Sequence, residues 1–223
     1  MKPTYYPSYE RFKELSGKGN IVPVYRQLLA DALTPVSVFK KISTAGHAFL
    51  LESASGGEKM ARYSFMGAKP FMEFTCRGNR METTRGGKKE RFDSKDPIGT
   101  LRKEIERFSP VAVDELPYFT GGAVGYFSYD TVRYTEVLPQ ATVDDLKLPD
   151  ILFMFFDSVV VFDHQDKIIR VIANAFLDGT DAKGAYKDAV RRIDALVDML
   201  RTPVESVSED ITTDGRVGKK FSS

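Results

Sequence analysis

The segment Thr120-Gly121-Gly122-Ala123-Val124-Gly125-Tyr126-Phe127 is the most informative part of the sequence for the fold. It places three glycines within five positions of an otherwise apolar run. Glycine has no side chain, so a strand rich in glycine lets another part of the molecule approach its backbone closely. The segment lacks the Lys-Ser/Thr ending of a P-loop and the spacing of a dinucleotide-binding fingerprint. We therefore predict a tightly packed β-strand rather than a phosphate-binding loop.

Short apolar or alternating runs on either side of this segment predict further strands. Residues 21–24 contain Pro23, which suits a strand at the edge of a sheet. Arg77-Gly78-Asn79 is typical of a hairpin turn. The other predicted strands are 48–52, 63–66, 70–76, 80–84, 88–92, 152–162 and 167–174, the last two forming a hairpin about residues 163–166.

Helical periodicity is clearest near the C-terminal end of the sequence. After Asp181, apolar residues up to Leu200 recur at the spacing of one helix face, which must be buried against something, most simply a sheet. Other helices are predicted at 8–16, capped by Ser8, in two short segments within 25–42, and from Pro97 to Phe108. We expect residues 1–201 to form one region and the polar residues 202–223 to be a linker or tail.

Composition and charge exclude several classes of protein. The chain has 223 residues, 32 basic and 31 acidic, with no basic stripe, so we expect neither nucleic acid nor a membrane as partner. Cys76 is the only cysteine, which rules out an internal disulfide and suits a reducing compartment. No apolar run approaches the roughly 18 residues of a membrane span. The sequence therefore predicts a soluble, cytoplasmic protein.

Candidate catalytic groups are few. His47 and His164 are the only histidines, and with one cysteine they cannot build the usual metal-binding spacings, so we predict structural or exposed roles for both. Asp163 and Asp166 flank His164 closely enough to suggest a metal, although polar turn residues give the same pattern more often. Arg133 and Glu136 have the spacing of an exposed helical ion pair. We predict no catalytic residue and no metal ligand in this chain.

Leu50-Leu51-Glu52-Ser53 is the best candidate for a binding site. The two leucines enter a core, so Glu52 and Ser53 are placed at the end of a strand, where their side chains can face a pocket. An amino acid ligand carries an ammonium group that Glu52 could neutralise, while Ser53 could form a hydrogen bond. The same dipeptide at a strand end is often only a solvated turn, and spacing alone does not decide between the two interpretations.

Several motifs together resemble the N-terminal region of anthranilate synthase component I, the chorismate-using subunit of tryptophan biosynthesis. The similarity runs from about Ile21 to Asn174, with the motifs in the family's order. The motifs are Leu50-Leu51-Glu52-Ser53, Arg62-Tyr63-Ser64-Phe65-Met66-Gly67, the glycine-rich segment continued by Ser128-Tyr129-Asp130, Leu148-Pro149-Asp150 and Phe162-Asp163-His164.

The resemblance implies an α+β fold of layered antiparallel β-sheets with flanking helices, which agrees with the predicted hairpins and terminal helix. It implies a whole enzyme that converts chorismate to anthranilate and pyruvate, with ammonia from a glutamine amidotransferase subunit and with Mg²⁺. It also implies feedback inhibition by L-tryptophan, with Ser53 and Glu52 as the effector-binding residues.

The family's catalytic and metal-binding motifs lie in a C-terminal chorismate-binding region, and none of them occurs in this sequence. We therefore expect residues 1–223 alone to be inactive and the magnesium ligands to lie in that missing region. Two alternatives remain open. One is a fragment of aminodeoxychorismate synthase component I of folate synthesis, and the other is a non-catalytic module that binds an aromatic amino acid.

Overall fold

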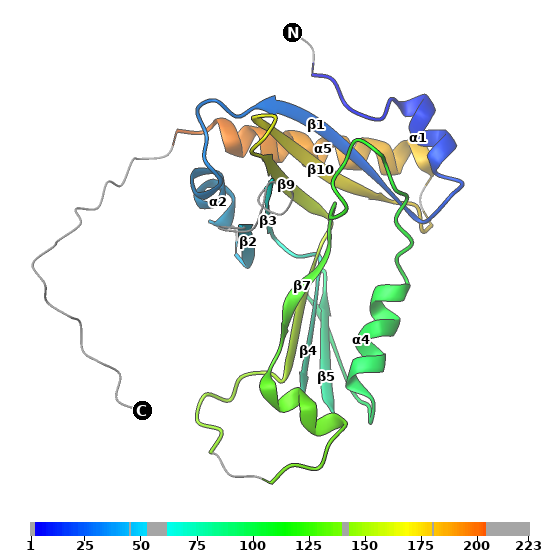
Figure 1. The fold of residues 1–223 in the computed structure, drawn as a ribbon. Helices are drawn as coiled ribbons and strands as arrows, with labels where there is room; N and C mark the ends of the chain where they lie inside the picture. Colours follow the sequence, from blue (N-terminus) through cyan, green and yellow to red (C-terminus); the bar gives the residue numbers. More distant parts are fainter. Residues whose placement is uncertain (1–2, 45, 53–61, 140–142, 180, 204–223) are drawn as a thin grey trace, which may run out of the picture.

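The computed structural model describes residues 3–44, 46–52, 62–139, 143–179 and 181–203. Two five-stranded antiparallel sheets form the framework, and helices flank them (Figure 1). The predicted α+β fold of antiparallel sheets with flanking helices is therefore confirmed.

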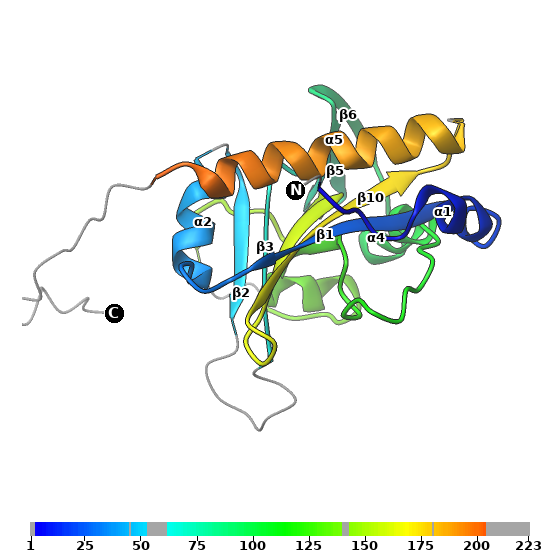
Figure 2. The same ribbon diagram turned by 90° about the horizontal axis from the view of Figure 1, so that it is seen from above.

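The first sheet, called sheet A, carries most of the helices. Its strands lie in the order β1-β10-β9-β3-β2. Figure 2 shows the long helix α5 running across this sheet, with α1 and α2 toward its two ends. The bounds are β1 (Ile21–Leu29), β2 (Ala48–Glu52), β3 (Tyr63–Ala68), β9 (Ser158–Asp163), β10 (Ile168–Phe176), α1 (Tyr9–Leu15), α2 (Pro35–Ser43) and α5 (Ala182–Arg201).

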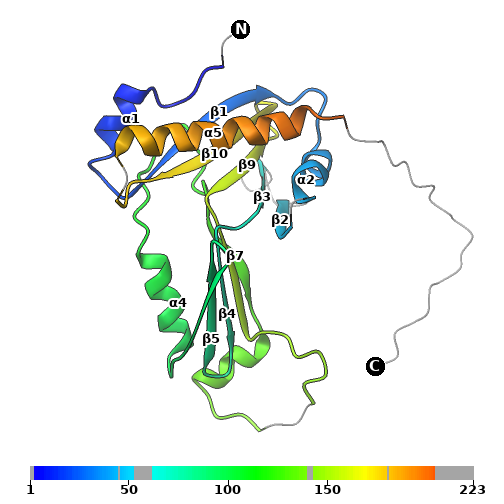
Figure 3. The ribbon, with the colours of Figure 1, turned by 180° about the vertical axis from the view of Figure 1, so that it is seen from behind.

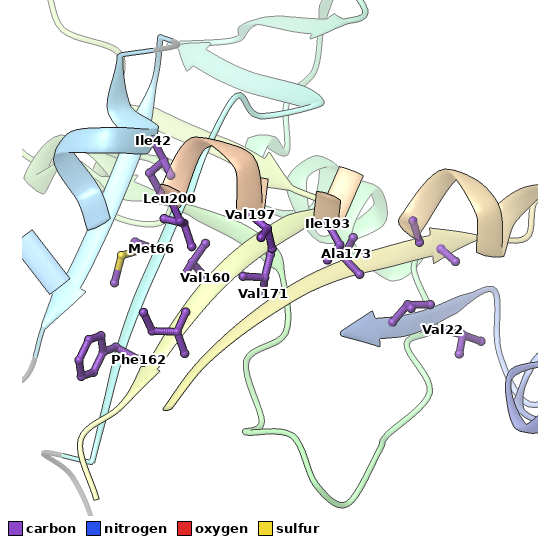
Figure 4. Close-up of a cluster of buried hydrophobic side chains, with 14 of the residues drawn as sticks. Val22, Ile42, Met66, Val160, Phe162, Val171, Ala173, Ile193, Val197 and Leu200 are labelled. Atoms are coloured by element: carbon purple, nitrogen blue, oxygen red, sulfur yellow. The ribbon is translucent and has the colours of Figure 1, made fainter. Parts of the chain in front are cut away.

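The apolar stripe predicted for the terminal helix is the main contact between α5 and sheet A. Ile193, Val197 and Leu200 are buried against strand residues such as Val160 and Val171 (Figure 4). The N-cap is Asp181, whose Oδ1 accepts from the Gly184 amide, and the helix ends at Arg201. The rest of the predicted tail, from residue 204 onward, lies outside the described residues.

The second sheet, sheet B, projects away from sheet A (Figures 1 and 3). Its order is β6-β5-β4-β8-β7, and its core forms between the sheet and helix α4. Gly78, with a φ of +55°, lies in the predicted hairpin turn between β4 and β5. The bounds are β4 (Met72–Arg77), β5 (Arg80–Arg85), β6 (Lys88–Asp93), β7 (Gly122–Phe127), β8 (Ile151–Phe156) and α4 (Pro97–Glu106).

The predicted strand 152–162 is wrong as a single element. The chain leaves sheet B after Phe156 and enters sheet A at Ser158, so Asp157 alone joins β8 to β9. Arg192 of α5 fixes this junction: Nη1 lies 3.1 Å from Asp157 Oδ1, and Nη2 donates to the Asn174 carbonyl at 2.6 Å. The apolar residues on the two sides of Asp157-Ser158 pack in different sheets.

The helix predicted in the first part of 25–42 is also wrong. Strand β1 continues to Leu29 and pairs with β10 along its whole length, from Ile21 opposite Phe176 to Leu29 opposite Ile168. Pairing with a buried strand outweighs the weak helical spacing of the leucines in this segment. The edge position predicted from Pro23 is confirmed. The second predicted helix is α2, which begins after a capping box formed by Thr34 and Ser37.

A 3₁₀-helix, η1 (Tyr129–Tyr134), follows β7 at the far end of sheet B. The predicted pair between Arg133 and Glu136 is wrong, because Arg133 Nε donates to Asp130 Oδ1 at 2.6 Å within the helix. The Tyr134 hydroxyl donates to Asp150 Oδ2 at 2.7 Å and so fixes η1 to the start of β8.

Candidate functional site

Glu52 lies where the sequence placed it, at the last position of β2. The register sets Glu52 opposite Ser64 of β3, and Ser64 opposite Phe162 of β9. Leu50 packs against the core between sheet A and its helices, whereas Leu51 is 48% exposed. The Glu52 side chain is exposed, so its carboxylate is open to a cationic ligand. Ser53, the other predicted effector-binding residue, lies outside the described residues.

A cluster of ionic side chains occupies the adjacent ends of β3 and β9. Asp163 is fully buried and accepts from Arg62 Nη2 and from Arg170 Nη1, each at 2.8 Å. Arg62 also reaches the exposed carboxylate of Asp166 at 2.8 Å. The prediction that Asp163 is an ordinary polar turn residue is therefore wrong, since its carboxylate is the centre of a buried ion-pair network.

The charge of Asp163 is maintained by its partners. Burial alone would raise the pKa of the Asp163 carboxyl, but hydrogen bonds from Arg62 and Arg170 outweigh that effect and lower the pKa from 3.8 to about 2. The amides of Gln165 and Asp166 donate to the same carboxylate at 3.1 and 3.2 Å. The network therefore stays ionised at neutral pH and fixes the ends of three neighbouring strand segments.

The two histidines make single polar contacts. His164 Nε2 lies 2.8 Å from the hydroxyl of Ser64, a fully buried residue in the strand position opposite Glu52. His47 Nδ1 lies 2.7 Å from Glu73 Oε1, and its side chain is 65% exposed. Within the described part of the chain, no three His, Cys, Asp or Glu side chains are grouped to hold a metal ion.

A separate apolar pocket of about 380 Å³ lies at the junction of the two sheets. Its walls include Phe71, Phe108, Phe155 and Phe176, from both sheets and from the end of α4. The sequence predictions missed this pocket, because its walls come from segments that are far apart in the chain. Gly67 of β3, three residues along the strand from Ser64, approaches Phe156, another of its walls. Glu52 is not among the residues that line the pocket, so the two are separate places in the structure.

The close approach predicted from the glycine-rich segment is confirmed at two positions. A Cβ atom on Gly121 would lie 2.8 Å from the Phe156 carbonyl and against the Asn174 amide, and the φ of Gly121 is +145°. A Cβ atom on Gly125 would collide with the Leu152 carbonyl of the neighbouring strand. Gly121 therefore lies directly against β8 and β10, and Gly125 lies directly against β8.

The match with known proteins agrees with this architecture. The family described as chorismate binding enzyme matches residues 46–216, and the chain belongs to that family. The relatives within this family are anthranilate synthase subunits. Anthranilate synthase component 1 of Acetivibrio thermocellus is 38% identical over 189 residues, which cover 85% of this chain and 38% of the relative.

A plant relative and a solved structure are also named as anthranilate synthase subunits. The anthranilate synthase alpha subunit 2 of Arabidopsis thaliana, a chloroplastic protein, is 35% identical over 90% of this chain and 36% of its own length. A crystal structure of anthranilate synthase component I from Streptococcus pneumoniae matches the fold with a TM-score of 0.54 and 26% identity. That match covers 80% of this chain and 37% of the other. The resemblance to anthranilate synthase component I is thus confirmed.

Two further observations bear on which functions can be assigned to the chain. It spans about two fifths of the length of the curated relatives it matches. None of the described helices is long and apolar enough to cross a membrane.

Proposed function

We propose that this chain is the N-terminal regulatory and structural part of an anthranilate synthase component I. The observation that carries the proposal is the 38% identity to the Acetivibrio thermocellus protein across 85% of this chain. The intact enzyme would convert chorismate to anthranilate and pyruvate in the cytoplasm. Its ammonia would come from a glutamine amidotransferase subunit.

In this proposal the chemistry takes place outside residues 1–223. Among the described residues no three His, Cys, Asp or Glu side chains are grouped to hold a metal ion, and the buried carboxylate of Asp163 is neutralised by arginines. Magnesium and chorismate would bind to the C-terminal three fifths of the enzyme. The chain would be inactive alone and would provide the framework on which the effector site is built.

The effector site would lie at the end of β2. An L-tryptophan ammonium group can pair with the exposed carboxylate of Glu52, and Ser53 would form a hydrogen bond with the same ligand. The Asp163 network supports this place, because it fixes the ends of β3 and β9 next to the strand that carries Glu52.

The enzymatic part of the proposal is tested with a chimera. Residues 1–223 replace the matched segment of Acetivibrio thermocellus anthranilate synthase component 1, and anthranilate fluorescence is followed with chorismate, ammonium and magnesium. We expect anthranilate formation within tenfold of the unaltered relative. Residues 1–223 alone should form none. A folded chimera without this activity would count against the assignment.

The effector part is tested by amide NMR on residues 1–223 with L-tryptophan, and with L-phenylalanine as control ligand. We expect saturable shifts around Glu52 with tryptophan only, and weaker binding in Ser53→Ala and Glu52→Gln. Glu90→Gln on the exposed strand β6 is the matched control and should bind normally. If the spectrum does not change when L-tryptophan is added, and the chimera is not inhibited by L-tryptophan, the effector site would be excluded.

A further inference from the structure

The apolar pocket between the two sheets is not used by the proposed function, and we call it the junction pocket. Its volume of about 380 Å³ lies within the range of about 300–1,000 Å³ that is usual for small-molecule sites. Its walls come from both sheets and from the connection between α4 and β7. Figure 1 shows this connection rising from α4 to sheet A before the chain returns to β7. The pocket is therefore formed by several elements of the fold and not by one loop.

Four phenylalanine rings form one wall of the junction pocket. The ring centroid of Phe71 lies 5.2 Å from that of Phe176, 5.9 Å from that of Phe108 and 6.3 Å from that of Phe155. The interplanar angles of these pairs are 64°, 89° and 70°, so the rings meet edge to face. Three of the four rings are only partly buried, those of Phe71, Phe108 and Phe176. Their free surface suits a further aromatic ring, which prefers the same geometry.

No charged side chain lines the junction pocket in the part of the chain that the structure describes. Its polar side chains are those of Tyr118, Thr120 and Asn174, and none of its described walls is an Asp, Glu, Lys, Arg or His residue. Moving an ionised group from water into such surroundings is strongly unfavourable when no opposite charge is present. The pocket therefore suits a neutral ligand. L-tryptophan, chorismate and anthranilate all carry charged groups at neutral pH and do not meet this condition.

Asn174 supplies a polar group that can select among neutral ligands. The residue lies on β10, is 5% exposed and lines the pocket. Its Nδ2 donates to the Thr120 carbonyl at 2.8 Å, whereas its Oδ1 is buried and has no hydrogen-bond partner among the described residues. Phe176 is two positions further along β10 and so faces the same side of sheet A. A ligand against Phe176 can therefore donate to Oδ1 with little competition from water.

The position of Asn174 is fixed before any ligand binds. Its backbone N–H donates to the Asp157 carbonyl at 2.7 Å, and its own carbonyl accepts from Arg192 Nη2 at 2.6 Å. On the other side, a Cβ atom on Gly121 would collide with the Asn174 amide nitrogen, so glycine is needed for this close approach. Every polar atom of Asn174 except Oδ1 thus has a partner on the chain. A ligand that pairs with Oδ1 does not have to order this side chain first.

We propose that the junction pocket binds a neutral aromatic molecule of one or two rings that carries an N–H or O–H donor. Its rings lie against Phe71 and Phe176, and its donor bonds to Asn174 Oδ1. The small volume of the pocket sets the limit on the number of rings. This site is separate from Glu52 and does not depend on the enzymatic activity assigned above.

Titration with indole tests the proposal on the 223-residue chain, because indole is neutral, has two fused rings and carries one N–H donor. Binding is followed by isothermal titration calorimetry and by amide NMR. We expect saturable binding at one site, with amide shifts concentrated in residues 108–123, 155–156 and 174–176. The absence of saturable binding, or shifts around Glu52 in place of these segments, would overturn the proposal.

Two further ligands separate the contribution of the donor from that of the rings. Benzothiophene has nearly the shape of indole but sulfur in place of the N–H group, so Asn174 Oδ1 stays without a partner and affinity should fall about fivefold. Indole-3-acetate has the same rings with a carboxylate, and it should not displace indole from a pocket without charges. Equal affinities for indole and benzothiophene, or displacement of indole by the carboxylate, would contradict the proposed recognition.

A substitution at Asn174 tests the same contact from the side of the protein. Asn174→Leu removes the acceptor and keeps a side chain of similar size, so affinity for indole should fall about fivefold while affinity for benzothiophene stays within about twofold. Gln27→Leu is the matched control, because it replaces an exposed amide on β1 outside the pocket and should leave both affinities unchanged. A folded Asn174→Leu variant that still prefers indole would exclude the role of Asn174. If this variant does not fold, the comparison of the two ligands on the unaltered chain decides.

The same indole titration on the chimera shows whether the site is open in the intact enzyme. We expect binding there with an affinity within about threefold of that of the 223-residue chain, because the walls of the pocket all lie in this chain. Binding by the 223-residue chain but not by the chimera would mean that protein fills the pocket in the intact enzyme, and the proposal would be wrong. Neither result depends on whether the chimera forms anthranilate, so the two proposals can fail separately.

Discussion

Sheet A and sheet B are built from the same number of strands but are stabilised differently. Sheet A has α1, α2 and α5 over one face and an ion-pair network at one end. Sheet B has one helix, α4, a smaller core and an apolar free edge. The comparison indicates that sheet A, with the larger core, supplies most of the stability of this chain. Substitutions in the two sheets should therefore lower the free energy of unfolding by different amounts.

The largest effect is expected at Asp163. In Asp163→Asn the charges of Arg62 and Arg170 lose their buried partner, and breaking a buried ion pair from one side costs about 3–5 kcal/mol. Urea unfolding followed by circular dichroism measures the change. Asp166→Asn is the matched control, because the Asp166 side chain is 47% exposed, and it should cost less than about 1 kcal/mol. Equal losses in the two variants would show that burial does not matter here.

A matched pair of core substitutions compares the two sheets directly. Ile193→Ala on α5 should cost about 4 kcal/mol, because the residue is fully buried between a long helix and sheet A. Leu101→Ala on α4 should cost about 2 kcal/mol, because the smaller core of sheet B can collapse around the cavity. Differential scanning calorimetry of both variants checks the order. A larger loss for Leu101→Ala would reverse our ranking of the sheets.

How well the sequence predicted the structure depended on how far apart in the chain the interacting residues lie. The stripe of α5 and its start after Asp181, the turn at Gly78 and the cap at Ser8 depend on residues close together in the chain, and the structure confirms them. The unbroken strand 152–162 is a prediction that failed because of a distant partner. Asp157 and Ser158 interrupt the apolar run, but they do not show that the strand changes sheets there, because Arg192, which fixes the junction, comes from α5.

The candidate site shows the same limit. The position of Glu52 at a strand end was predictable from two leucines followed by polar residues. The Asp163 network was not, because Arg62 precedes β3 and Arg170 lies in β10, and the two meet only when β9 pairs with both strands. The apolar pocket was missed for the same reason. The tryptophan-binding roles of Glu52 and Ser53 stay predictions.

Acid should affect sheet A through Asp163. Its pKa is about 2 in the folded protein and near 3.8 in the unfolded chain, so the charged network stabilises the fold above about pH 4 and loses that contribution as the pH falls toward 2. The loss should be about 2 kcal/mol. Urea titrations at several pH values measure it. The slope between pH 4 and pH 2 should be reduced in Asp163→Asn, and an unchanged slope would assign the acid sensitivity to other groups.

The smallest effect is expected at the far end of sheet B. Tyr134→Phe removes the hydroxyl that donates to Asp150 Oδ2 at 2.7 Å, and a hydrogen bond to a charged group contributes about 1.5 kcal/mol. The Gly78 amide keeps its own bond to the same carboxylate, which limits the loss. Because this bond ties η1 to the start of β8, the variant should speed hydrogen exchange in residues 129–138 while the global unfolding free energy changes little. A fall in global stability as large as that of Ile193→Ala would mean that sheets A and B unfold as one unit, which would contradict the contrast drawn between them.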